Sequence, residues 1–247
     1  MKRVLICLMS AIVIFQSCNK DENNTVEVIK EPESVAEQNS NDDKAIAVYM
    51  DEHYLDAQGL IQDISSTNTT VTQTKLSDLD WKKLESGVIV ITRAGAQPSA
   101  QTAVTIGSTD VIRLMSVTDT FLSKVEDDGK IDYSSNYTFR NTVDGTGVPE
   151  VDPYYYYVKK AVLENTANTE DQKKKSFYEI EGFQEGLKHF KSFNQEDSQL
   201  HNLQGVIIVP SRAAYARDAH YTSSYRNRSF VFNFQVYKST VRPANAE

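Results

Sequence analysis

The side chains that could carry out chemistry are few and scattered in this 247-residue chain. Its histidines lack the spacing of metal ligands, and no serine stands in a nucleophile motif. The histidines are His53, His189, His201 and His220. We therefore expect neither a hydrolase nor a metalloenzyme, and we expect no metal and no cofactor. His53 lies at helical spacing with apolar residues, which favours a packed side chain over a ligand.

Tyr215 is the side chain whose position most suggests a binding site. It follows Pro210-Ser211 at the end of the apolar run 206–209, and a second apolar run covers residues 230–237. Both runs have the length and the β-branched or aromatic content of strands. The long polar segment between them is too broken for a hairpin turn, and long loops of this kind usually carry function. Tyr215 is therefore expected either to contact a ligand beside the sheet or to anchor the loop by packing.

The remaining elements that must position such a loop follow from hydrophobic periodicity. Helical spacing predicts a helix over about 43–57, and a second helix begins at residue 181 with Phe183, Leu187 and Phe190 on one face. The predicted strands cover 69–74, 87–92, 110–115 with a continuation to 122, 130–135 and 177–180. Mostly strands with one short helix indicate an antiparallel sheet wrapped round that helix, which is an α+β fold.

The N-terminus predicts export and lipid attachment. A basic start is followed by the apolar run 4–15, which is too short to span a bilayer, and then by Ser17-Cys18 and an abruptly polar segment. This pattern resembles a bacterial lipoprotein signal, in which Cys18 becomes the lipid-bearing first residue. The only other cysteine, Cys7, lies in the predicted leader, so no internal disulfide is expected. The alternative is an ordinary secreted protein with an incidental cysteine.

Composition restricts the partners of the chain. The formal net charge is −8, and the acidic residues are spread along the sequence, which argues against a nucleic-acid partner. Residues 19–40 are too polar to order themselves and predict a flexible tether. The expected organisation is a leader (1–17), a tether (18–42), an N-terminal helix and linker (43–86) and a sheet domain (87–240) with an insertion at about 136–172.

Within the sheet domain, a series of short motifs occurs in a fixed order along the chain. They are Asp128-Gly129, Asp132 with Ser134-Ser135, Ile180-Glu181-Gly182-Phe183 with Gly186-Leu187, Pro210-Ser211 with Ala214-Tyr215, and Phe230-Val231-Phe232. This order resembles that of the FKBP-type peptidyl-prolyl cis/trans isomerases, the immunophilins that bind macrolide drugs. The resemblance covers residues 87–240. It implies an FKBP-like antiparallel, half-wrapped β-sheet around a short central α-helix, to which this chain adds its N-terminal helix.

The resemblance also implies a pocket between the helix, the sheet and the final loop. Asp132 would be the pocket carboxylate, Phe183 its aromatic floor and Phe232 a wall. The backbone N–H of Ile180 and the hydroxyl of Tyr215 would bind the carbonyls of a peptide. Asp132 has an alternative reading as a turn residue whose side chain bonds the local backbone.

The sequence departs from the family pattern at several pocket positions. Leu114 stands where the family usually has a pocket tyrosine, Ile131 where it has phenylalanine, and Ala216 where a glycine follows the loop tyrosine. We therefore expect reduced prolyl isomerase activity or none, in a folding helper of the cell envelope. Its expected partners are a proline-containing polypeptide or an envelope protein, and the membrane through the lipid anchor.

The alternative is a catalytically degenerate FKBP-like binding lipoprotein. In that case the run of four tyrosines at 154–157 would carry the contacts with a partner, because exposed aromatic side chains favour such surfaces. Packing of these rings over a sheet edge is the competing interpretation. We expect a monomer in either case.

Overall fold

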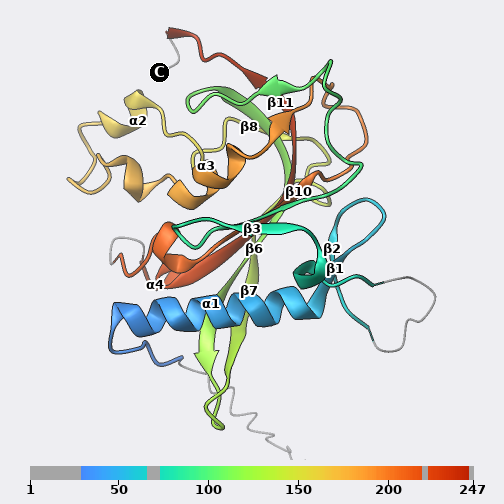
Figure 1. The fold of residues 1–247 in the computed structure, drawn as a ribbon. Helices are drawn as coiled ribbons and strands as arrows, with labels where there is room; N and C mark the ends of the chain where they lie inside the picture. The colour runs from blue at the N-terminus through green and yellow to red at the C-terminus, as the bar shows by residue number, and fades with distance from the viewer. Residues whose placement is uncertain (1–28, 66–72, 219–221, 245–247) are drawn as a thin grey trace, which may run out of the picture.

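The computed structural model of the protein describes residues 29–65, 73–218 and 222–244. Its fold is α+β, with a mostly antiparallel sheet between two helices (Figure 1). The predicted leader, the lipidation residue Cys18 and most of the predicted strand 69–74 lie outside the described residues. In the part that the structure describes, no helix is long and apolar enough to cross a membrane.

The main sheet contains seven strands, and six of them form one continuous order. In spatial order these are β3 (Trp81–Lys83), β4 (Ile89–Thr92), β10 (Gly205–Val209), β11 (Arg228–Thr240), β6 (Val111–Val125) and β7 (Ile131–Asn141). The seventh, β8 (Glu150–Val151), pairs with β6. The predicted strands at 87–92, 110–122, 206–209 and 230–237 are therefore confirmed. The β6–β7 hairpin is longer than its sequence pattern predicted, and its end extends past α1 (Val35–Glu52) (Figure 1).

Alternate side chains of the central strands form two separate cores, because successive residues of a strand point to opposite faces. Ile207 and Val209 of β10 join the core on the side of α3 (Glu181–Leu187). Val206 and Ile208 join the core on the side of α1. We call these the α3 core and the α1 core.

The first helix begins earlier than its apolar pattern predicted. The hydroxyl of Ser34 accepts a hydrogen bond from the N–H of Glu37 at 3.0 Å and caps α1, and the chain becomes extended at His53. The inward-facing residues of its first turns are polar: Gln38, Asn41 and Asp42 are all buried. The prediction of a tether as far as residue 42 is therefore wrong for residues 35–42. His53 is packed as expected, with its ring stacked on Tyr49 at 3.8 Å.

Close contact between α3 and the sheet explains two glycines of this helix. A Cβ at Gly182 would lie 2.5 Å from Cγ1 of Val209, and a Cβ at Gly186 would lie 2.6 Å from Cγ2 of Ile207. The two glycines are four residues apart and so share one helical face. They let the α3 backbone approach β10, which fixes the helix that carries Phe183.

The remaining elements are short. They are β1 (His53–Leu55), β2 (Ile61–Asp63), β5 (Val104–Thr105), β9 (Lys191–Ser192), α2 (Lys160–Leu163), α4 (Thr222–Tyr225) and the 3-10 helices η1 (Leu76–Asp78), η2 (Lys175–Phe177) and η3 (Ser211–Ala213). The predicted strand at 177–180 is wrong, because η2 ends at Phe177 and the chain then turns into α3, which begins at Glu181. Because β7 continues to Asn141, the insertion begins after residue 141 rather than at 136.

Candidate functional site

The α3 core contains most of the side chains expected at the site. They are Leu114, Ile180, Phe183, Tyr215 and Phe232, and all are buried. The rings of Phe183 and Phe232 stack at 4.2 Å with an interplanar angle of 26°. Helix α3 supplies one ring and strand β11 the other, so the predicted floor and wall lie against each other.

A third ring, from the insertion, fills the space beside this pair. Tyr155 has no exposed surface, and its ring lies 5.8 Å from Phe183, 5.8 Å from Phe232 and 5.5 Å from Phe139. Its hydroxyl donates to Glu150 at 3.2 Å. Burial raises the pKa of this phenol well above its ordinary value, because the charged form would lose its water. The pocket region is therefore filled by a neutral side chain of the same chain.

Carbonyl groups of the chain itself accept from the two hydrogen-bond donors expected to hold a peptide. The N–H of Ile180 donates to the carbonyl of Tyr155 at 2.8 Å. The hydroxyl of Tyr215 donates to the carbonyl of Tyr178 at 2.9 Å. Both donors thus bind carbonyls of the chain itself, one in the insertion and one in the turn between η2 and α3.

Side chains of α3 and its preceding turn extend these contacts along the insertion. Gln184 donates from Nε2 to the carbonyl of Tyr156 at 2.6 Å, and Glu179 accepts from the N–H of Val158 at 2.9 Å. Residues 152–157 are therefore held as a peptide would be, by a ring in an aromatic cluster and by several backbone bonds. We call residues 152–157 the plug.

The four tyrosines of the plug region divide into two kinds. Tyr155 and Tyr156 are buried, whereas Tyr154 and Tyr157 are half-buried. Tyr156 lines a hollow of about 210 Å³ beside α3, and Tyr154 and Tyr157 line another of about 390 Å³. The sequence predicts that the tyrosine run either contacts a partner or packs over the sheet. Two of its rings are packed in the core and two remain partly exposed, so each interpretation describes only part of the run.

Arg242, which follows β11, holds both ends of the plug. Its guanidinium donates from Nη1 to Asp152 at 2.7 Å, and only 2% of its side chain and 8% of that of Asp152 are exposed. The same guanidinium lies 3.8 Å from the ring centroid of Tyr157 and donates to the carbonyl of Thr109. Sequence reasoning missed this residue, since a lone arginine near the C-terminus carries no recognisable signal.

Two of the predicted site residues lie away from the cluster. Asp132 pairs with Lys124 on β6, whereas Phe232 pairs with Thr118, six positions away. At roughly 3.3 Å per residue this separation is about 20 Å. The carboxylate of Asp132 instead accepts from the N–H of Tyr133 at 2.7 Å. This local backbone bond matches the alternative interpretation, but Asp132 lies in β7 and not in the turn.

Ile131 lies on the opposite side of the sheet from Phe183. Its partly buried side chain packs against the α1 core. The sheet therefore separates it from the cluster, and the structure does not bring Ile131 or Asp132 together with Phe183, Tyr215 and Phe232.

A buried carboxylate lies in the α1 core. Asp42 has no exposed surface and accepts hydrogen bonds from Gln38 at 2.7 Å, Ser123 at 2.9 Å and Ser211 at 2.5 Å. Burial raises the pKa of this carboxyl, an effect that the three donors oppose. These bonds join α1 to β6 and to the turn after β10, so we assign Asp42 a structural role.

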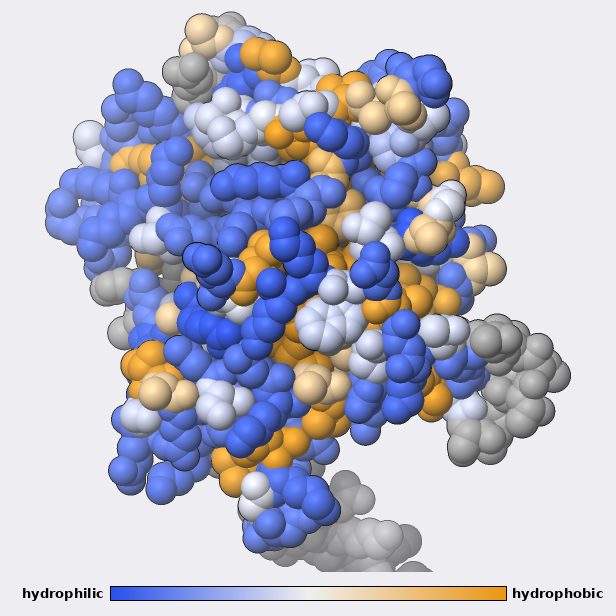
Figure 2. Space-filling model, in the orientation of Figure 1, coloured by the Kyte–Doolittle hydropathy of each residue, from blue (hydrophilic) through white to orange (hydrophobic). Residues whose placement is uncertain are grey.

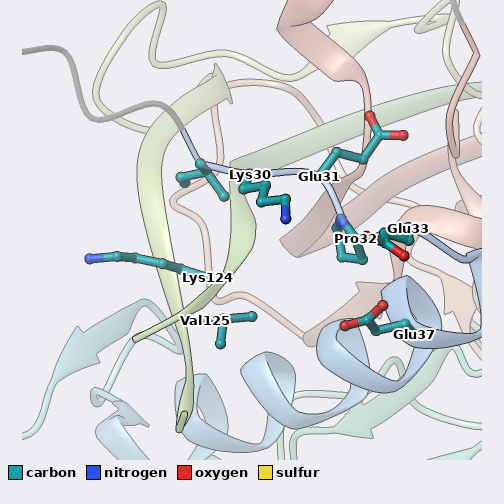
Figure 3. A pocket seen from close by; sticks show the side chains of 8 residues that line it. Lys30, Glu31, Pro32, Glu33, Glu37, Lys124 and Val125 are labelled. Atoms are coloured by element: carbon teal, nitrogen blue, oxygen red, sulfur yellow. The ribbon is translucent and has the colours of Figure 1, made fainter. Parts of the chain in front are cut away.

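A hollow of about 530 Å³ lies between the N-terminal segment and the end of β6 (Figure 3). Its lining mixes both charges, and the side chains of Glu31 and Lys124 point away from its centre (Figure 3). Glu31 is bound instead by Arg226 at 2.7 Å. Among the described residues, no group of three or more histidine, cysteine or acidic side chains could hold a metal ion. The geometry of this hollow indicates no particular chemistry.

The face of the molecule drawn in Figure 2 is mainly hydrophilic, with apolar side chains in small patches.

Comparison with known proteins adds no further constraint on the site. No protein-family model matches the chain, and no curated protein matches it. The arrangement of the α3 core is therefore the main guide to function.

Proposed function

We propose that the protein is an FKBP-like lipoprotein of the cell envelope that binds polypeptide segments, as a folding helper or an interaction module. The lipid anchor would be attached at Cys18. The FKBP-like scaffold is supported by the order of strand, turn, strand, helix, loop and strand given by β6, β7, α3, the loop 210–227 and β11. It is also supported by the antiparallel pairing of these strands and by α3 lying against one face of the sheet.

One observation carries the binding function. The α3 core already holds a peptide segment of the chain itself, with the ring of Tyr155 between aromatic side chains and its carbonyl on the N–H of Ile180. A site with this chemistry is suited to a short polypeptide segment that forms a turn, as residues 153–157 do, because backbone bonds provide affinity and the aromatic cluster provides selectivity.

The test of this function is binding of an unfolded polypeptide by the full chain. We expect the protein to retain a permanently unfolded model polypeptide and to slow its aggregation, and Phe183→Ala to weaken both effects. A surface substitution, Lys82→Ala on the exposed strand β3, is the control. Absence of retention by the wild-type protein would contradict the proposal.

Prolyl isomerase activity is the second candidate, favoured by the stacked Phe183 and Phe232 and by the position of Tyr215. Rotation about an X-Pro bond faces a barrier of about 18–20 kcal/mol because amide resonance is lost on twisting. A dry aromatic pocket that prefers the twisted amide lowers this barrier without a nucleophile or a metal. With Tyr155 in place, the ring of a proline has no room beside Phe183.

A refolding reaction limited by proline isomerisation distinguishes the two candidates. We expect little or no acceleration by the wild-type protein, and equal rates for Asp132→Ala and Tyr215→Phe. A large acceleration that Tyr215→Phe reduces would instead favour the isomerase.

A further inference from the structure

The plug, residues 152–157, occupies the α3 core without belonging to a regular element. It lies between β8 and α2, in an insertion whose helices and strands are only two to four residues long. Tyr155 points into the cluster. Of the residues that flank the plug, Val151 is half exposed, whereas Val158 is buried. Few backbone bonds of the sheet would break if the plug alone left the core.

Arg242 is the principal contact that holds the plug from outside the aromatic cluster. It binds Asp152 at the first residue of the plug and covers the ring of Tyr157 at the last. Lys159 also lies 3.6 Å from the Asp152 carboxylate, but its side chain is 53% exposed. Arg242 is therefore the buried partner of Asp152, and its loss would leave a buried charge poorly compensated.

The backbone of the plug is under strain at its first residue. Asp152 has φ of +58°, in the left-handed region, and is followed by Pro153. Proline favours an extended conformation in the residue before it, and the left-handed region is unfavourable for residues other than glycine. Release of Asp152 from Arg242 would let this residue return to an extended conformation.

We propose that the plug is an exchangeable internal ligand of the α3 core, held closed by Arg242. The external ligand would be a polypeptide segment of the same chemistry and the same turn conformation, with a tyrosine ring for the cluster and a backbone carbonyl for the N–H of Ile180. This inference rests on the proposed polypeptide-binding function and names its ligand class.

Replacement of one tyrosine ring by another makes this binding mode physically reasonable. A ligand tyrosine replaces the ring that leaves, so the cluster of Phe139, Phe183 and Phe232 does not remain empty. The apparent affinity of the ligand equals its intrinsic affinity multiplied by the fraction of molecules in which the plug is open, so a mostly closed plug weakens binding. Weakening the contact with Arg242 should therefore raise the apparent affinity without any change in the cluster.

The first test measures binding of a labelled peptide with the sequence of residues 153–156, Pro-Tyr-Tyr-Tyr, by fluorescence anisotropy. This peptide lacks the counterparts of Asp152 and Tyr157, so it does not depend on Arg242. Arg242→Met keeps an unbranched side chain but removes the charge. We expect this variant to bind the peptide at least tenfold more tightly than the wild-type protein. A peptide with glycine in place of the second tyrosine should lose this gain.

Arg212→Met is the matched control. Arg212 likewise binds one carboxylate, Asp43 at 2.7 Å, and two backbone carbonyls, those of Ser86 and Asn39, but it joins α1 to the loop after β10. We expect it to bind the peptide as the wild-type protein does. Equal affinities of Arg242→Met and Arg212→Met for the peptide would overturn the proposal.

The second test needs no variant and no ligand. Amide hydrogen exchange of the wild-type protein compares the N–H groups of Ile180 and Val158, which bind across the plug, with that of Ile207 in the centre of the sheet. We expect the first two to exchange together and at least a hundredfold faster than the third. Exchange of all three at one rate would show that the plug leaves only on global unfolding, and would overturn the proposal.

The two tests separate this inference from the function on which it rests. If the wild-type protein retains unfolded polypeptide while the plug amides stay protected at the rate of Ile207, binding uses another surface and only the inference fails. If the plug amides exchange early but no polypeptide is retained, the proposed function fails.

Discussion

Substitution of Tyr155 measures how much the plug contributes to the free energy of unfolding through its packing in the α3 core. The ring is fully buried and contacts Phe139, Phe183 and Phe232, while its hydroxyl makes one bond to Glu150. Tyr155→Phe removes only the hydroxyl, and Tyr155→Ala removes the ring as well. The pair therefore separates the hydrogen bond from the packing.

Burial of the ring and the single bond of the hydroxyl set the expected size of each effect. Loss of a buried aromatic ring to alanine lowers the free energy of unfolding by about 3–5 kcal/mol, because the transfer energy is lost and a cavity remains. Loss of the hydroxyl bond lowers it by about 0.5–1.5 kcal/mol. The larger value, for Tyr155→Ala, holds only if the plug stays closed. If the plug opens in this variant, the loss of unfolding free energy cannot exceed the free energy of opening the plug.

Urea unfolding followed by circular dichroism is the appropriate assay, with Tyr154→Ala as the control. Tyr154 is half-buried and is the neighbour of Tyr155 in the same segment, so its loss should cost less than half as much. If the plug opens in Tyr155→Ala, the loss will be smaller and the dependence of stability on urea will also fall, because less surface remains to be exposed. A loss no larger than that of Tyr154→Ala, with unchanged urea dependence, would refute the packing described for Tyr155.

Three further predictions concern other parts of the chain. Burial raises the pKa of Asp42 in the folded protein, so protonation favours the folded state. As the pH falls from 7 to 4, the free energy of unfolding of the wild-type protein should therefore rise relative to that of Asp42→Asn. Urea unfolding of both proteins across this pH range checks the prediction. Gly186→Ala should cost about 1–3 kcal/mol of unfolding free energy, since its Cβ would overlap Ile207, whereas Glu181→Ala on the exposed side of α3 should cost much less. Cys18→Ser should move the protein from the membrane fraction to the soluble fraction of a cell lysate.

Each of these predictions has a clear opposite result. A stability difference between wild type and Asp42→Asn that does not change with pH would mean that burial does not raise the pKa of Asp42. Equal costs of Gly186→Ala and Glu181→Ala would contradict the close approach of α3 to β10. Unchanged membrane association of Cys18→Ser would argue against lipid attachment at this residue.

The strands and the central helix could be predicted because their apolar patterns are local. The continuous apolar run of β10 marks a strand that is buried on both faces, and the spacing of Phe183 and Leu187 marks one face of α3. The start of α1 could not be predicted in this way. Its first inward-facing residues are polar, and only their bonds to Ser123 and Ser211, which are distant in sequence, make burial favourable.

The site itself was predictable only in part. The aromatic pair and Tyr215 follow from the motifs near α3 and β11, but Asp132 depends on the length of the β6–β7 hairpin, which its sequence does not set. Nothing in the spacing of the four tyrosines identifies Tyr155 as the ring that enters the core. That choice depends on contacts with Phe139 and Phe232, which are far from it in the chain.

The division of the molecule into two cores has a consequence for how its sequence can change in evolution. Because Val206 and Ile208 face one core and Ile207 and Val209 the other, a substitution at one residue is compensated on its own side of the sheet. Among related sequences, residues two apart on β10 should therefore vary together, and adjacent residues should vary independently. The ligand preference of the α3 core could then change through mutations that leave the packing of α1 intact.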